Sequence, residues 1–410
     1  MLGGSRPHRA TTARLAALHP LAGSSPLAVR STYIGRDLFG ASFGFDPFAL
    51  YAAGLLSNPN VVVAGQIGRG KSSLIKSFLW RQASLGRGAW VIDPKGEYSA
   101  LADAAGCRCV RLGSDESASI NLLEPASGGA EEIPLAVSAV AHLAEAAMKR
   151  DLRPTERAAL EIAVGRTARG RNPGLSALSA ALLSPLAEDA EGAGTDPAGL
   201  ARDGRELALQ IRMLASGEIG RVLEAPAGKS LDLGARLVVL DLSALHGTEH
   251  LGLVMGALLA WMGARQRHMA PMKRYVVLDE AWAVLSEPAV ARWAQVSWKL
   301  ARAYGVSNIA VVHRMSDLAS VGQPASVQNA WAKGLLSDSE TRVVFAQSPG
   351  EAEASRSLLG IGVNEAALLP SLGSGVALWK LGTRSFLVRH RLGTKEAALV
   401  DTDQAMRGWP

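Results

Sequence analysis

The chain has 410 residues, of which 48% are hydrophobic and 20% are charged, an ordinary composition for a globular protein long enough to bury a substantial core. Its 43 basic and 37 acidic side chains give a formal charge of +6, compatible with nucleic acid or an anionic membrane as a partner. Much of that excess is carried by the arginines of the first 36 residues. The length argues against a single minimal domain, and no apolar run reaches the length of about 18 residues that a membrane-spanning helix needs.

The start of the chain is rich in Arg, Ala, Ser and Pro. This composition predicts a flexible basic leader over residues 1–32 and not a cleavable signal peptide. We expect ordered structure to begin near Tyr33.

A phosphate-binding motif follows the first core strand. Residues 61–73 read VVVAGQIGRGKSS, an apolar strand pattern that runs into the complete Walker A pattern GxxxxGK[ST]. Lys71 is expected to reach the β- and γ-phosphates, and the Ser72 hydroxyl is expected to bind Mg²⁺. We also expect residues 44–60 to close over the nucleotide. The predicted nucleotide contacts are Gly65, Gln66, Ile67, Gly68, Arg69, Gly70, Lys71, Ser72 and Ser73.

A helix is predicted over residues 71–85, and a second buried strand over residues 89–92. The sequence DPKGEY starts at Asp93, directly after that strand. Because ligands gather at the carboxyl ends of strands in open α/β sheets, we predict that Asp93 contacts the nucleotide. A third strand is expected over residues 109–112, and the only two cysteines, Cys107 and Cys109, are expected to be reduced thiols.

The pattern then becomes helical and later returns to strands. Alanine- and leucine-rich periodicity from about residue 124 to residue 229, interrupted by a loop at residues 188–199, predicts an all-helical insertion. Two apolar segments, 134–148 and 251–264, fit buried helices. Alternation of short apolar strands with helices predicts an α/β fold with a mostly parallel sheet covered on both faces. The later strands are expected at residues 236–241, 274–279, 308–312, 341–345 and 376–379.

A carboxylate pair ends one of these strands. Residues 274–282 read RYVVLDEAW, which places Asp279 and Glu280 at a strand tip. Asp279 is suited to hold a Mg²⁺-bound water, and Glu280 to orient and deprotonate the attacking water. The same pattern also fits a buried strand followed by a solvated acidic turn, but the upstream phosphate loop favours the catalytic interpretation.

Two further polar residues flank the strand at 308–312. His313 follows it and is a candidate to contact the γ-phosphate or the attacking water, although a lone histidine is also a common structural residue. Arg302 precedes the strand at the end of a predicted helix. On its own, Arg302 fits a solvated partner of the helix dipole.

Several motifs occur together in a characteristic order: GQIGRGKSS, DPKGEY, SINLLEP, GEIGRVLEAPAG, LDLSAL, VVLDEAW, LARAYG and VVHRMSDL. This series resembles the ATPase domain of the HerA-FtsK superfamily, specifically the VirB-type and TraG/TraC-like ATPases of conjugation and type IV secretion. The resemblance extends from about residue 44 to residue 392. It implies a RecA-like P-loop fold with ATP and Mg²⁺ as ligands.

The resemblance also implies roles for individual residues. Lys71, Ser72, Asp279 and Glu280 match the Walker A and Walker B positions, and Arg302 matches an arginine finger that reaches the nucleotide of a neighbouring subunit. Such a finger implies a ring, expected to be a hexamer. His313 stands where the family usually has glutamine, and this departure leaves its sensor role open. Arg342 and Arg384 are lower-ranked candidates for interfacial contact with the nucleotide.

The expected organisation is a leader (1–32), two parts of one ATPase domain (33–123 and 231–392), the helical insertion between them (124–230) and a tail (393–410). The implied function is an ATP-hydrolysing motor of a conjugation or secretion apparatus, in the cytoplasm or on the cytoplasmic face of the membrane. Its partners would be further copies of the chain, components of the apparatus and, if the motor moves DNA, the DNA itself. A stand-alone DNA translocase and a nucleotide-gated scaffold with little turnover are two different functions that the sequence also allows.

Overall fold

The structure, a computed structural model, does not describe the whole chain. It describes residues 31–113, 119–124, 132–224, 231, 233–266, 269, 272–285, 294, 298, 299, 301–316, 334, 336 and 338–400. Nearly all of the predicted leader and residues 401–410 of the predicted tail lie outside these ranges.

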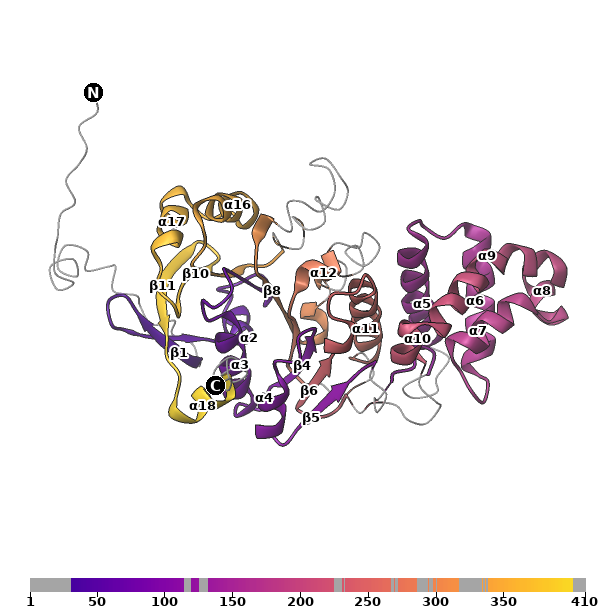
Figure 1. The fold of residues 1–410 in the computed structure, drawn as a ribbon, viewed down its shortest axis with the longest axis horizontal. Coiled ribbons are helices and arrows are strands. Elements are labelled where there is room, and N and C mark those ends of the chain that lie inside the picture. The colour runs from indigo at the N-terminus through magenta and orange to yellow at the C-terminus, as the bar shows by residue number, and fades with distance from the viewer. Residues whose placement is uncertain are drawn as a thin grey trace, which may run out of the picture.

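An 11-stranded sheet forms the body of the molecule (Figure 1). Its order is β2-β1-β11-β10-β9-β3-β8-β7-β4-β6-β5. The strands from β9 to β5 in this order run parallel, whereas β10, β11, β1 and β2 pair antiparallel. The predicted α/β class with a mostly parallel sheet is therefore confirmed. The strands are β1 (Thr32–Asp37), β2 (Ser42–Phe45), β3 (Val61–Ala64), β4 (Gly88–Asp93), β5 (Arg108–Arg111), β6 (Leu237–Asp241), β7 (Arg274–Leu278), β8 (Val306–Val312), β9 (Thr341–Phe345), β10 (Val376–Leu381) and β11 (Arg384–His390).

Hydrophobic cores cover both faces of the sheet. Successive residues of a strand point to opposite faces, so Val61 and Val63 join one core while Val62 and Ala64 join the other. The core containing Val61 is covered by α2 (Pro47–Ala52), α3 (Lys71–Ala83) and α4 (Ser99–Ala104), and α18 (Thr394–Val400) packs against α3 and α4. The other is covered by α11 (Leu251–Gln266), α16 (Pro349–Leu359) and α17 (Val363–Leu368).

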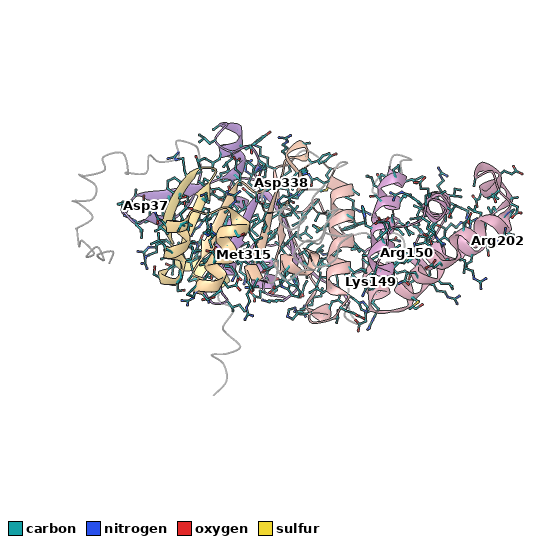
Figure 2. The ribbon with its side chains drawn as sticks, turned by 90° about the horizontal axis from the view of Figure 1, so that it is seen from above. Asp37, Lys149, Arg150, Arg202, Met315 and Asp338 are labelled. Atoms are coloured by element: carbon teal, nitrogen blue, oxygen red, sulfur yellow. The ribbon has the colours of Figure 1, made fainter. Side chains whose placement is uncertain are left out.

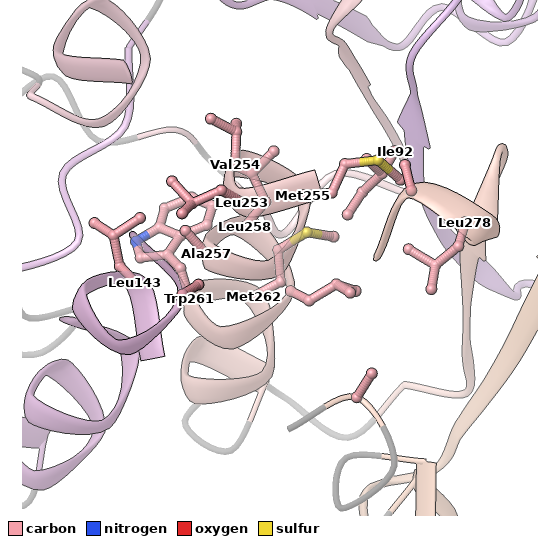
Figure 3. Close-up of a cluster of buried hydrophobic side chains, with 14 of the residues drawn as sticks. Ile92, Leu143, Leu253, Val254, Met255, Ala257, Leu258, Trp261, Met262 and Leu278 are labelled. Atoms are coloured by element: carbon pink, nitrogen blue, oxygen red, sulfur yellow. The ribbon is translucent and has the colours of Figure 1, made fainter. Parts of the chain in front are cut away.

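Helix α11 joins the sheet to a separate group of helices. It is apolar around most of its circumference, as expected of a helix buried on all sides. Trp261 on α11 lies near Leu143 of α5, while Met255 lies toward Ile92 and Leu278 of the sheet (Figure 3). The group consists of α5 (Ile133–Met148), α6 (Pro154–Ala168), α7 (Leu175–Leu183), α8 (Ala187–Gly192), α9 (Pro197–Ser216) and α10 (Glu218–Leu223).

The helical group makes the molecule long. Seen from above, Lys149, Arg150 and Arg202 lie in the helical group at one end, and Asp37 lies in the hairpin at the other (Figure 2). The first described strand, β1, lies beside β11 near the end of the chain (Figure 1). Strands from the two ends of the described chain therefore pair with each other on the antiparallel side of the sheet.

Two local predictions are wrong. Residues 188–199 are not one loop, because α8 occupies most of their first half and α9 begins at Pro197. Residues 44–60 do not close over the phosphate loop. Phe48 of α2 packs on Tyr275, with ring centroids 5.1 Å apart, and Asp46 pairs with Arg87 at 3.2 Å, directly before β4. These contacts place α2 toward the amino ends of the parallel strands, away from the phosphate loop.

Candidate active site

The predicted site residues that follow strands gather at one edge of the sheet. β3, β8, β7 and β4 are consecutive and parallel, so their carboxyl ends meet there. The phosphate loop follows β3, His313 follows β8, Asp279 and Glu280 follow β7, and Asp93 ends β4. We call this the carboxyl edge.

The phosphate loop has the backbone that its glycines allow. Gly65, Gly68 and Gly70 have φ values of 146°, 74° and 106°, which other residues adopt rarely. A Cβ on Gly65 would lie 2.6 Å from the Cβ of Phe345, so the close packing against β9 also requires glycine. Gly70 is the N-cap of α3 and no side chain caps the helix, which leaves the first-turn N–H groups available to an anion.

Lys71 is folded into this loop. Its Nζ donates to the carbonyl oxygens of Gly65 at 2.6 Å and Gln66 at 2.8 Å. Burial lowers its pKa to about 8, against the opposing charges of Asp279 and Glu280. A buried ammonium with an adjustable side chain is suited to exchange the two carbonyls for phosphate oxygens.

The remaining loop residues are anchored or exposed. Gln66 N donates to Ala346 O at 3.0 Å, and the carbonyl oxygen of Arg69 accepts from Gly375 N at 3.0 Å. Ile67 is 73% exposed. Ser72 and Ser73 are half-buried in the first turn of α3. The roles of all these residues as nucleotide ligands stay predictions.

Asp279 is a buried carboxylate with few donors. Its Oδ2 accepts from Tyr98 Oη at 3.2 Å, and its Oδ1 accepts from Glu280 N at 3.0 Å. Burial, and then the negative charge of Glu280, raise its pKa. A bound cation would relieve this cost, so the site fits the predicted Mg²⁺ ligand.

The donor set fits magnesium rather than a metal held by protein alone. Among the residues described, no group of three or more His, Cys, Asp or Glu side chains could hold a metal ion. Mg²⁺ normally takes one or two protein oxygens and completes its shell with phosphate and water oxygens. Ser72 and Asp279 offer oxygens of this kind, and their role as Mg²⁺ ligands stays a prediction.

Glu280 is held from three directions. Its Oε1 pairs with Lys95 Nζ and lies 2.9 Å from His313 Nε2, and its Oε2 accepts from Trp282 Nε1 at 2.5 Å. Burial favours the protonated form, but the hydrogen bonds and charges of His313 and Lys95 outweigh it and lower the pKa of Glu280 to about 2. The backbone is left-handed at this residue, with φ of 52°. Glu280 is thus ionised and fixed in orientation.

Asp93 organises the loop that carries Lys95. Its carboxylate accepts from the backbone N–H groups of Lys95 at 3.2 Å, Gly96 at 3.0 Å and Tyr98 at 2.9 Å. Asp93 is fully buried, and burial raises its pKa to about 6. Both of its oxygens are engaged by the loop, so the predicted contact with nucleotide would require a change in these bonds. That contact stays a prediction.

His313 begins a turn that is anchored to a helix. Met315 N and Ser316 N donate to Glu351 Oε2 of α16 at 2.7 Å and 3.1 Å, which ties the turn after β8 to that helix. The side chain of His313 is 13% exposed and faces Glu280 and Lys95. The structure therefore places the histidine next to the predicted base, where its role as a sensor stays a prediction.

The three arginine candidates lie away from this edge. Arg302 is exposed in a 3₁₀ turn (Ala301–Tyr304) before β8, and the seven residues of β8 separate it by about 20 Å from the carboxyl edge. Arg384 is exposed at the start of β11, level with the amino end of β9. Arg342, on β9, has its pKa lowered by burial. Arg302 and Arg384 thus lie far from the carboxyl edge of their own chain, and their contact with the nucleotide of another copy stays a prediction.

Lys95, Trp282 and Tyr98 were not singled out from the sequence as site residues. The signal was present, because Lys95 and Tyr98 belong to the DPKGEY motif and Trp282 to VVLDEAW. The sequence does not show that the loop after β4 reaches across β7.

Within the described part of the chain, no helix combines the length and apolar character needed to cross a membrane. No family model matches the sequence, and no curated protein matches it.

Solved structures share the fold. VirB4 of Thermoanaerobacter pseudethanolicus is 19% identical with a TM-score of 0.73, over 91% of this chain and 100% of that one. The bacterial conjugative coupling protein TrwB, in an unbound form, is 14% identical with a TM-score of 0.59, over 96% and 97% of the two chains. TrwB in complex with ADP and Mg²⁺ is 14% identical with a TM-score of 0.54, over 82% and 85%. The predicted resemblance is therefore confirmed at the level of the fold, which this chain shares with VirB4 and TrwB.

Proposed function

We propose that the protein is an ATP-hydrolysing motor of a conjugation or type IV secretion apparatus and that it works as a ring of identical subunits. One observation carries the proposal. The phosphate loop and the Asp279–Glu280 pair meet at the carboxyl edge, whereas Arg302 is exposed at the opposite edge. One copy of the chain thus offers most of a hydrolytic site at one edge. At the other edge it offers Arg302, the positive charge that would complete such a site in a neighbouring copy.

The chemistry follows from the residues at the edge. The loop N–H groups and Lys71 would bind the ATP phosphates, and Ser72 and Asp279 would hold Mg²⁺, which would neutralise phosphate charge. Glu280 takes a proton from the attacking water as the oxygen–phosphorus bond forms and the bond to the ADP oxygen breaks. Arg302 of a neighbouring copy stabilises the charge on the transferred phosphoryl oxygens.

A ring follows from the separation of the two edges. A contact between unlike surfaces of identical subunits repeats head to tail and closes when the rotation allows, here as the expected hexamer. Arg302 would then reach the nucleotide held by the next subunit. In this proposal the sheet forms the motor, residues 124–230 form an insertion, and other membrane-bound components of the apparatus hold the ring at the cytoplasmic face.

The transported substrate is either DNA or protein. The first 36 residues contain five arginines and no acidic residue, so the rest of the chain carries a formal charge of only +1. This distribution supports transfer of protein rather than a basic channel through the body. DNA translocation is a second candidate because Arg202, Arg205 and Arg212 are exposed on α9, at spacings that place them on one side of the helix.

The test is the ATPase rate with and without single- and double-stranded DNA for the wild type, Glu280→Gln and Arg302→Ala. We expect Mg²⁺-dependent hydrolysis that both substitutions lower strongly. Turnover in Glu280→Gln equal to wild type would exclude Glu280 as the base. If DNA neither stimulates hydrolysis nor binds at low salt, the translocase is excluded. If no condition gives hydrolysis, the nucleotide-gated scaffold is the remaining function.

A further inference from the structure

Lys95 is a candidate for a further role at the carboxyl edge because its ammonium pairs directly with the proposed base. Its loop follows β4, and its side chain reaches across β7 to His313, which follows β8. On the way, the ammonium pairs with Glu280 Oε1. A surface lysine left to solvent would not bridge three consecutive strands.

The contact between Lys95 and Glu280 does not depend on the protonation state of the histidine. Lys95 Nζ lies 3.2 Å from His313 Nε2, and this nitrogen lies 2.9 Å from Glu280 Oε1. An ammonium can only donate, so His313 Nε2 either accepts from Lys95 or donates to Glu280, but not both. Nδ1 of His313 is buried and has no hydrogen-bond partner among the described residues, so no contact within that part of the chain selects one tautomer. Lys95 donates to Glu280 in either case.

The loop that carries Lys95 is itself rigidly built. Asp93 accepts three of its backbone N–H groups, and Tyr98 ties the loop to Asp279. Gly96 has φ of 71° and packs against Asp241, whose carboxylate oxygens would lie 3.3 Å from an added Cβ. Glu280, in contrast, has a left-handed backbone that is rare for glutamate and persists only when its surroundings hold it.

We propose that Lys95 is a positioning residue: its ammonium holds the Glu280 carboxylate in the orientation that accepts the proton of the attacking water. This inference rests on the proposed ATP hydrolysis. It assigns Lys95 no contact with the nucleotide, so the residue acts on turnover and not on binding. A second phosphate-binding lysine would act on both.

The experiment compares the full-length wild type with Lys95→Gln, Lys95→Arg and a control, Lys395→Gln, which alters an exposed lysine on α18. It measures kcat and KM for ATP, and the Kd of a fluorescent ATP analogue. We expect Lys95→Gln to lower kcat about tenfold or more while Kd stays within about twofold, because a misplaced base slows chemistry without loosening the substrate. Lys95→Arg, which keeps the charge, should recover most of the loss, and the control should match the wild type.

The outcomes separate this inference from the proposed function. If the wild type hydrolyses ATP and Glu280→Gln does not, an unchanged kcat in Lys95→Gln contradicts the positioning role alone. A Kd raised in proportion to the loss of turnover would make Lys95 a nucleotide ligand and also overturn it. If Lys95→Gln does not fold, Lys95→Arg decides the matter, since an arginine variant with wild-type Kd but the turnover of Glu280→Gln contradicts the inference. Absence of ATPase activity in the wild type would instead contradict the proposed function.

Discussion

Two glutamates in different parts of the molecule are each paired with two basic residues. Glu280 at the carboxyl edge is gripped by Lys95 and His313, and Glu156 in the helical group is gripped by Arg150 and Arg153, both at 2.8 Å. Hydrogen bonds to the basic partners, acting against burial at both sites, lower each glutamate pKa to about 2.

The two sites differ in what surrounds the pair. Glu156 lies in the first turn of α6, where its Oε2 also accepts from the N-cap residue, Arg153 N, at 2.8 Å. All of its hydrogen bonds are made to residues at or just before the start of α6. Glu280 has a left-handed backbone, stands beside the buried Asp279 and lies at the edge that carries the phosphate loop. A lowered pKa is therefore common to a structural glutamate and to the proposed catalytic base, and the neighbouring groups distinguish them.

The largest effect on turnover should come from removing the charge of Glu280. Glu280→Gln should lower kcat about 100-fold or more, because a general base contributes at least that much. Its unfolding temperature should change little, since glutamine can still accept from Trp282 and Lys95. ATPase assays and thermal unfolding of the same preparations would measure both. Equal turnover in the variant would remove the distinction between the two glutamates.

Lys71→Ala tests whether the carboxyl edge binds phosphate. We expect the Kd of ATP to rise about tenfold or more, because a charge-assisted contact to the phosphates is lost. Titration with a fluorescent nucleotide gives the Kd. Wild-type affinity in this variant would mean that the loop of residues 65–72 has a structural role only.

Glu156→Gln should show the opposite behaviour to Glu280→Gln. We expect its free energy of unfolding to fall by about 1–2 kcal/mol, less than a fully buried pair would lose, because Arg150 and Arg153 are partly exposed and screened. Its kcat should stay within about twofold of wild type. Denaturant unfolding and ATPase assays provide the comparison, and a large loss of turnover would show that the helical group takes part in catalysis.

The smallest effect should be a pH dependence of that stability difference. Glu156 has a folded-state pKa of about 2 against an ordinary value of 4.5, so its ionised form stabilises the protein above about pH 4.5. This contribution is lost as the pH falls toward 2. The stability difference between wild type and Glu156→Gln should therefore be full at neutral pH and shrink on acidification. A difference that grows on acidification would contradict the assignment.

The apolar strands of the sheet could be predicted from the sequence more accurately than the edge strands and the helical insertion. The strands from Val61–Ala64 to Val376–Leu381 were predicted within about two residues at each end, because strands buried on both faces are short apolar runs between glycines and charges. β1 and β2 were not predicted as strands, because short, partly exposed strands such as Ser42–Phe45 lack that signature. The start of α9 was missed although Asp196 and Pro197 form a recognisable N-cap and first turn.

The candidate site could be predicted only as far as its motifs. The phosphate loop and the Asp279–Glu280 pair stand out because their residue types and spacing are specific. The contacts of Glu280 with Lys95 and His313 depend on strand order, which places β4, β7 and β8 side by side although they are far apart in sequence. Nothing in local periodicity encodes that order.

In the proposed ring, one hydrolytic site is divided between two copies of the chain. The most direct test mixes Arg302→Ala with Glu280→Gln protein, each nearly inactive alone, in equal amounts under conditions that allow subunits to exchange. Every junction that joins the intact Glu280 of one copy to the intact Arg302 of the next is complete, so random mixing should restore up to about one quarter of wild-type ATPase activity. Activity no higher than the average of the two separate variants would contradict a shared site.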